Sequence, residues 1–305
     1  MSKTPRFDDL KVETPLAQAS RTILRRLAEA VLHEAPDVLR GDDVRAVHNM
    51  RVALRRTRTL LQVLSPCYRR RPFERVRVDL RTLARRLGKV RDADVHLGAL
   101  RSALGGATVE EADGISHAID AHYHDRRRAL ARFAIALSQF DRDYFLSFVE
   151  SARGEANLGE FLPPVIKRRL RRFIKALEYG LDDESDGRLH AARIAGKRLR
   201  YILEAFRELF GPEVKTALAS LELIQERLGS IIDAAHFVAR YDELLLALEP
   251  GDARIIGLRA QIGACELARE RALAELHTLW DSEPPYPVLL AGLISSALAS
   301  VSISA

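Results

Sequence analysis

The chain has 305 residues, 47% hydrophobic and 30% charged, a composition typical of a globular protein with ample material for a core. A formal net charge of +6 and a pI near 9.5 are only moderately basic, so the clustering of cations is more informative than their total. The N-terminus lacks the apolar core of a signal peptide, and Cys67 and Cys265 are far apart, which argues against a secreted disulfide scaffold. We therefore expect free or buried thiols and a cytoplasmic protein.

Almost every segment of the first half predicts a helix, and no stretch alternates with period two for long enough to form a sheet. Thr14 and Pro15 are typical of a helix start, as are Gly41-Asp42-Asp43 before the next helix. Thr108 with Glu111 predicts a capping box. The expected helices run from residue 15 to about 33, from 43 to about 65, and over 72–104, 108–138 and 142–152.

The segment from Arg153 to Pro164, with its glycines and double proline, predicts a linker between two domains, 15–152 and 164–282. Further helices are expected over 164–180, 186–210, 212–248 and 252–282. The fold class is all-α, and we predict two antiparallel four-helix bundles.

The remaining tail, 284–305, is apolar and rich in serine, and carries no charge after Glu283. It is shorter and more polar than the roughly 20 apolar residues that a membrane span needs. We therefore favour a loosely docked or disordered terminus over a membrane anchor.

One basic helix of the first half has a second copy in the second half. Residues 47–64 read VHNMRVALRRTRTLLQVL, and residues 189–206 read LHAARIAGKRLRYILEAF. This match predicts an internal repeat and two halves related by a pseudo-twofold axis. Aligned without a gap, one histidine and four cations coincide: His48, Arg51, Arg55, Arg56 and Arg58 match His190, Arg193, Lys197, Arg198 and Arg200.

Helical spacing gathers most of these cations into one row. Positions i, i+3, i+7 and i+10 fall within an arc of roughly 80°, so His48, Arg51, Arg55 and Arg58 form a row about 15 Å long. No acidic residue lies between Val47 and Leu64 to relieve the repulsion within it. A solvated arginine face is the alternative for a single copy, but two matched copies favour a polyanion site.

Further cations share helix faces in other predicted helices. We expect them either to complete the wall of such a site or to lie on solvated surface. They are Arg81 and Arg85, Arg128 and Arg132, and Arg169, Arg172 and Lys175.

The repeat continues into the following helix of each half. Leu87-Gly88-Lys89-Val90-Arg91-Asp92 matches the segment from Leu228 to Asp233. A glycine inside a long helix costs about 1 kcal/mol relative to alanine. We therefore interpret Gly88, Gly229, Asp92 and Asp233 as positions of close helix packing or a kink rather than as ligand contacts.

These motifs together resemble those of the CHAD family, the conserved histidine α-helical domain, over about Pro15 to Trp280. The resemblance implies a pair of four-helix bundles whose basic helices line a central groove or pore that binds inorganic polyphosphate, with association with polyphosphate granules as a further expectation. CHAD domains are often fused to a CYTH triphosphatase domain, marked by a Glu-x-Glu-x-Lys strand. This sequence has no such strand, so we expect a stand-alone, non-catalytic CHAD protein.

The two repeated histidines leave several roles open. His48 and His190 suit a hydrogen bond to phosphate, and helix packing or capping is the next interpretation. A phosphohistidine nucleophile or a metal ligand is less favoured, because no acid lies on the basic face and nearby arginines repel a cation. We expect no metal and no cofactor. His117, His122 and His124 lack a clean i, i+4 metal pair and are predicted to be surface residues.

Nucleic-acid binding is the main alternative, because RNA or DNA would also fit a cationic groove. The basic rows carry few aromatic residues for base stacking, with Tyr201 as the one exception, and no helix-turn-helix, RRM or zinc spacing appears. A polyphosphate-processing enzyme is a weaker alternative, since the motifs lack acids and metal ligands.

Overall fold

The computed structural model describes residue 5 and residues 7–302, and this part of the chain is all-α, which confirms the predicted fold class. No strand forms within these residues; Pro15 and Asn157 make an isolated bridge. The first half contains α1 (Leu16–Arg40), α2 (Val44–Val63), α3 (Arg70–Leu104), α4 (Val109–Ser138) and α5 (Arg142–Glu150). The second half contains α6 (Leu158–Asp183), α7 (Asp186–Ala205), α8 (Glu213–Leu245), α9 (Arg254–Trp280) and α10 (Tyr286–Ser302).

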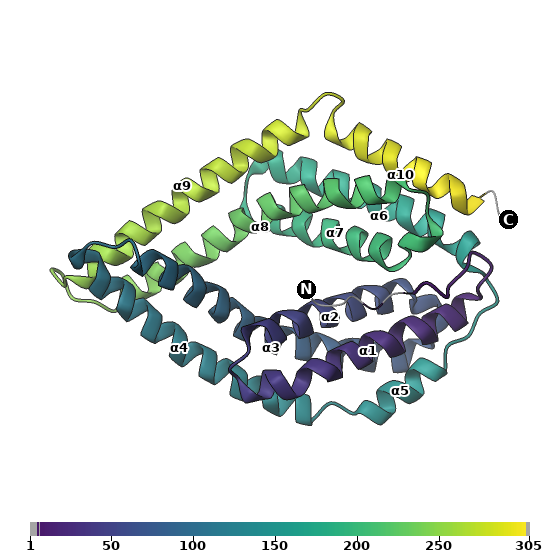
Figure 1. Ribbon diagram of the computed structural model, residues 1–305, viewed down its shortest axis with the longest axis horizontal. Helices are drawn as coiled ribbons and strands as arrows, with labels where there is room; N and C mark the ends of the chain where they lie inside the picture. Colours follow the sequence, from purple (N-terminus) through teal and green to yellow (C-terminus); the bar gives the residue numbers. More distant parts are fainter. Residues whose placement is uncertain (1–4, 6, 303–305) are drawn as a thin grey trace.

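Helices that follow each other in the chain pack against each other within each half, α1 to α4 in the first and α6 to α9 in the second. Several pairs of helices make contact across the halves, among them α1 with α6. α2 packs against α7, and α4 packs against α9 at the left tip of the molecule in Figure 1. The two long helix pairs α3–α4 and α8–α9 therefore extend from the α2–α7 contact to a second contact between the halves.

The basic helix α2 begins where the sequence indicates. The carboxylate of Asp43 accepts hydrogen bonds from the backbone N–H groups of Arg45 and Ala46, which satisfies donors that a helix start leaves unpaired. Gly41 ends the preceding helix α1 with a φ of +86°, a conformation that favours glycine. The predicted capping box of Thr108 and Glu111 is present at the start of α4.

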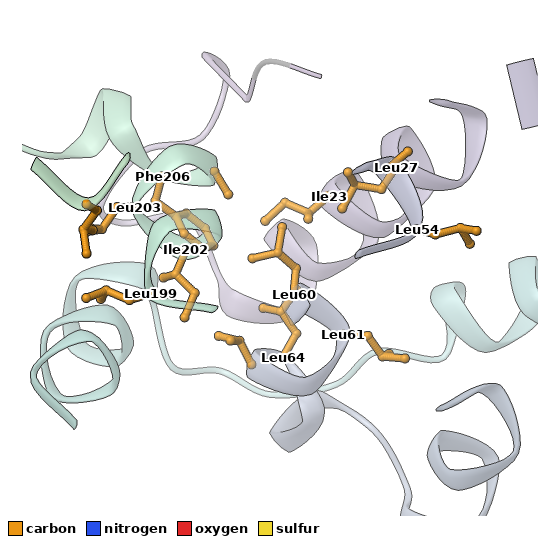
Figure 2. Close-up of a cluster of buried hydrophobic side chains, with 14 of the residues drawn as sticks. Ile23, Leu27, Leu54, Leu60, Leu61, Leu64, Leu199, Ile202, Leu203 and Phe206 are labelled. Carbon is orange, nitrogen blue, oxygen red and sulfur yellow. The ribbon is translucent and has the colours of Figure 1, made fainter. Parts of the chain in front are cut away.

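A hydrophobic junction joins the C-terminal halves of α2 and α7 into one continuous core. Figure 2 shows buried side chains from both halves in this cluster. Because these leucine and isoleucine side chains are almost fully removed from water, each contributes on the order of 1.5–3 kcal/mol to folding. The labelled residues are Ile23, Leu27, Leu54, Leu60, Leu61 and Leu64 of the first half and Leu199, Ile202, Leu203 and Phe206 of the second.

The second contact between the halves depends on two glycines. A Cβ atom on Gly114 of α4 would lie 2.2 Å from the carbonyl oxygen of Arg254, and one on Gly257 of α9 would lie 2.2 Å from that of Glu111. Neither position can hold a larger residue without moving the backbone. The glycines therefore allow α4 and α9 to approach closely, a device that the sequence reasoning missed.

Two helices are longer than predicted. α1 continues past Pro36 to Arg40 because Val38, beyond the proline, is fully buried. α6 begins at Leu158, so part of the expected linker is helical and Pro163 and Pro164 lie inside it. The capping box of Asn157 and Glu160 starts this helix early, and burial of Leu158 and Leu162 holds it in spite of the prolines.

The prediction of a loose C-terminal tail was wrong. Residues 286–302 form α10, which packs against α8 and α6 and buries Leu290, Ile294 and Val301. The Tyr286 hydroxyl donates to the carbonyl of Ser220 at 3.3 Å and anchors the start of the helix. The end of the predicted tail, 303–305, lies outside the described residues. In the part of the chain that the structure describes, no helix is long and apolar enough to cross a membrane.

Candidate anion-binding site

The basic rows of α2 and α7 meet beside the hydrophobic junction and form one cluster of cations. Arg51 and Arg55 of α2 and Arg193 and Lys197 of α7 line both of two adjoining cavities, and we call these four residues the collar. Sequence reasoning placed all four on basic rows. The structure adds that the two rows face each other across a common space.

The larger of the two cavities, about 490 Å³, is named here the arginine chamber. Beyond the collar it is lined by Arg58, Arg77, Arg81, Arg198 and His190. No carboxylate is among the described residues that line it. Burial, followed by repulsion from Arg81, Arg198 and Arg77, lowers the pKa of Arg58. Cations are thus concentrated here, although Arg77 is paired with Glu74, which does not line the chamber.

The smaller cavity, about 240 Å³, lies on the other side of the collar and is named the histidine chamber. Two carboxylates line it and face the collar. Asp92 Oδ1 lies 3.8 Å from Arg51 Nη1, and Asp233 Oδ1 lies 3.7 Å from Arg193 Nη2. Its other polar lining residues are His48, Arg91, His96 and His236.

The structure therefore corrects the interpretation of the Leu-Gly motif. Asp92 and Asp233 belong to the cavity wall and not only to helix packing. A Cβ on Gly88 would meet nothing within 4 Å, and one on Gly229 would meet only the Arg193 guanidinium, at 3.8 Å for Nη2. Neither glycine is required by close packing, although Gly229 leaves room beside Arg193.

The four cations of the collar are crowded and buried, and their pKa values are lowered. Burial and the neighbouring cations lower the pKa values of Arg51, Arg55 and Arg193. Burial, followed by repulsion from Arg55, Arg193 and Arg51, lowers the pKa of Lys197 to about 6. An arginine stays charged under these conditions, whereas this lysine is largely neutral at pH 7 until an anion arrives.

Several buried polar atoms at the collar have no partner within the described structure. They are Nε of Arg55, Nε of Arg193 and the hydroxyl of Tyr201. A buried donor without a partner costs about 1–3 kcal/mol, so such groups indicate that a ligand or water completes the site. All three residues line the arginine chamber.

Tyr201 lies beneath the arginines instead of presenting its ring to solvent. The residue is 2% exposed, and the guanidinium carbons of Arg55, Arg56 and Arg200 lie 5.9, 5.7 and 5.6 Å from the ring centroid. The ring supports the cations through cation–π contacts. The only aromatic residue that sequence reasoning offered for base stacking is therefore covered.

His48 and His190 fall on opposite sides of the collar, His48 in the histidine chamber and His190 in the arginine chamber. Burial lowers the pKa of both, and nearby cations lower it further: Arg91, Arg55 and Arg51 for His48, and Arg193, His236 and Lys197 for His190. Both are therefore neutral at pH 7 and can donate one hydrogen bond each.

Two of the predicted binding residues, Arg56 and Arg200, lie outside both chambers. Glu204 binds Arg56 at 2.8 Å and Arg200 at 3.3 Å, and Glu222 binds Arg200 at 3.1 Å. These acids neutralise the two arginines and tie the helices together. Arg58 and Arg198, by contrast, face the arginine chamber.

The additional cations divide among several places. Arg81 lines the arginine chamber, whereas Arg85, Arg128 and Arg132 line a third cavity of about 850 Å³ between α3, α4 and α8, which we call the outer chamber. Arg169 lies beside Arg198, whose charge, after burial, lowers its pKa. Arg172 and Lys175 line none of the three chambers, and Lys175 lies 5.3 Å from the ring of Tyr179.

Sequence reasoning also missed a histidine pair. His122 is 3% exposed and not a surface residue, and its Nε2 lies 3.2 Å from Nδ1 of His96. His96 also packs on Phe237, with ring centroids 4.1 Å apart. The partners come from three different helices, α4, α3 and α8, so no local spacing could have indicated the pair. His117 and His124 do not join it; His117 lies near Arg254 at 3.4 Å.

Comparison with known proteins places this fold and these motifs in a family. The model of the CHAD domain matches residues 22–242. Two uncharacterized proteins of Mycobacterium tuberculosis, from two strains, are each 30% identical over 213 residues, which is 63% of this chain and 40% of the relative. The chain thus spans well under two thirds of the length of these relatives.

Solved structures share the fold at low sequence identity. The crystal structure of the CHAD domain from the plant Ricinus communis superposes with a TM-score of 0.68 at 23% identity, covering 96% of both chains. PptA from Streptomyces chartreusis superposes with a TM-score of 0.67 at 18% identity, covering 88% of this chain and 100% of the other.

Proposed function

This chain belongs to the CHAD family, and on that premise we propose that it binds inorganic polyphosphate at the collar and in the chambers beside it. The observation that carries the proposal is the convergence of Arg51, Arg55, Arg193 and Lys197 on one space between two helices. Polyphosphate is a flexible chain with about one negative charge per phosphate and no bases to read. A protein that binds it therefore needs only cations and hydrogen-bond donors.

The unpartnered donors support the same ligand. Nε of Arg55, Nε of Arg193 and the Tyr201 hydroxyl are buried at the collar and lack acceptors. Phosphate oxygens accept from several guanidinium N–H groups at once, so they are suited to such donors. An anion would also favour the protonated form of Lys197 and so restore its charge.

Nucleic acid is less favoured by the same residues. Sequence-tolerant binding of single strands uses exposed aromatic rings, and Tyr201 is 2% exposed beneath three arginines. We further propose that the site binds without catalysis, because Asp92 and Asp233, the carboxylates nearest the collar, face Arg51 and Arg193. In this position both carboxylates support the cations of the collar.

Replacing the collar tests this function. The quadruple variant Arg51→Ala/Arg55→Ala/Arg193→Ala/Lys197→Ala should lose polyphosphate binding in calorimetric titration while its circular dichroism stays helical. A matched control removes four exposed cations elsewhere, Arg25, Arg40, Arg75 and Arg207, whose side chains are 45–64% exposed. Equal binding by wild type and collar variant would refute the proposed site.

A further inference from the structure

Helix α3 carries a second row of cations that the repeated motif does not include. Arg77, Arg81, Arg85 and Lys89 follow each other at four-residue intervals. At 1.5 Å per residue, neighbouring members are about 6 Å apart along the axis and the row is about 18 Å long. Arg81, Arg85 and Lys89 are exposed and make no ion pair with any described residue. Arg77 is paired with Glu74 at 2.6 Å.

The matching face of α8 has no such row. The register that aligns Leu87-Gly88 with Leu228-Gly229 places four other residues at the corresponding positions: Leu218, Glu222, Glu226 and Ser230. The repeat preserves the collar but not this row, so α3 and α8 offer a polyanion different surfaces outside the collar.

The row on α3 connects two of the chambers. Its first half, Arg77 and Arg81, lines the arginine chamber, and its second half, Arg85 and Lys89, lines the outer chamber. Arg128 and Arg132 of α4 line the outer chamber as well. Arg128 forms an ion pair with Asp125 at 2.6 Å. The outer chamber is also lined by Asp92, Asp125 and Glu243, so it is not free of acids. The cations nevertheless follow one another from the collar along α3 to α4.

We propose that a polyphosphate chain held at the collar leaves through the arginine chamber and continues along the α3 row to Arg132, and not along the matching face of α8. The inference rests on the proposed function and deepens it, since it states which surface the rest of the chain occupies. Each additional phosphate neutralised outside the collar releases counterions, which strengthens binding of long chains and steepens its salt dependence. A short chain that fills only the collar gains nothing from this path.

The test compares tripolyphosphate with long-chain polyphosphate. The variant Arg85→Ala/Lys89→Ala/Arg132→Ala removes three exposed cations outside the collar. It should weaken long-chain binding by about tenfold and flatten its salt dependence, and it should leave tripolyphosphate binding unchanged. The control Lys215→Ala/Arg259→Ala/Arg271→Ala removes the same charge from exposed positions of the second half and should leave both ligands unaffected.

A gain-of-function variant tests the same path from the other half. Glu226→Arg/Ser230→Lys, at two exposed positions of α8, should build the missing row and strengthen binding of long chains alone. If the triple variant and its control weaken long-chain binding equally, the path along α3 is refuted while the collar stands. If wild type binds neither ligand, the proposed function fails and this inference with it.

Discussion

The arginine chamber and the histidine chamber share the four cations of the collar but differ in the charges around them. The arginine chamber adds Arg58, Arg77, Arg81 and Arg198 and no described carboxylate. The histidine chamber adds Asp92 and Asp233, which face Arg51 and Arg193. The repeated motif supplies the four cations of the collar, whereas side chains outside the collar make the arginine chamber more cationic than the histidine chamber.

Among the variants that compare the two chambers, the largest expected effect comes from removing a cation of the arginine chamber. Arg58→Ala, in the arginine chamber, should weaken polyphosphate binding about 10- to 100-fold, since a hydrogen bond to a charged group contributes about 1.5–3 kcal/mol. Calorimetric titration at one salt concentration measures the loss. Arg91→Ala, the matched removal of one charge from the histidine chamber, should have a clearly smaller effect. A larger loss in Arg91→Ala than in Arg58→Ala would reverse the comparison between the chambers.

The pH dependence of binding should come chiefly from the collar. The pKa of Lys197 is lowered to about 6 in the free protein, and a bound polyanion raises it. Binding therefore takes up a proton above pH 6, and affinity should fall as the pH rises above 6, by up to about tenfold per unit. The fall ends at the pKa of the bound state.

Titrations between pH 6 and pH 8 measure this dependence. The variant Lys197→Arg carries the residue found at the matching position of α2, Arg55, and stays charged throughout this range. It should bind with little pH dependence. An unchanged slope in this variant would assign the proton to another group.

Removing the carboxylates should have a moderate effect of opposite sign. A carboxylate about 6 Å from a phosphate in a water-like dielectric costs roughly 0.7 kcal/mol. Asp92→Asn/Asp233→Asn should therefore strengthen polyphosphate binding, by about tenfold at most. Fluorescence anisotropy with labelled polyphosphate measures the gain. Weaker binding would mean that these acids position Arg51 and Arg193 more than they repel the ligand.

The smallest effect on binding is expected from the histidine pair at the back of the histidine chamber. Burial first, and nearby cations, lower the pKa of His96 to about 3 and of His122 to about 4. In the unfolded chain these two histidines take up protons as the pH falls below about 6.5, whereas in the folded protein they remain neutral until a lower pH. The free energy of unfolding should therefore decrease from about pH 6.5 towards pH 4. His122, which is 3% exposed, would account for up to about 3 kcal/mol.

Thermal unfolding between pH 7 and pH 4 measures this loss. His122→Gln should be less sensitive to acid, while its polyphosphate binding at pH 7 stays that of wild type. A wild-type melting temperature that does not change over this range would contradict the assignment.

The sequence predicts those features of the site that lie on one helix. The rows of α2 and α7 could be found because their cations recur at helical spacing, and Asp43 and Thr108 mark helix starts by local chemistry. Arg56 and Arg200 share the rows, yet Glu204 and Glu222 neutralise them across helices. Local spacing carries no information on such contacts.

Contacts between helices account for the other differences between the structure and what the sequence predicts. Asp92 belongs to the site only because α3 brings it to Arg51, and His122 is buried only because α3 and α8 cover it. The tail becomes α10 because α8 and α6 offer its apolar side chains a surface. Gly114 and Gly257 reveal their role only where α4 crosses α9.

Calorimetric titration with long-chain polyphosphate across a salt series, repeated with single-stranded RNA of matched charge, tests polyphosphate recognition most directly. The collar and its acid-free chamber predict tight polyphosphate binding that persists at moderate salt, with RNA bound much more weakly. Equal affinities for the two ligands that fall together as the salt concentration rises would contradict specific recognition of polyphosphate and would favour a generic cationic surface.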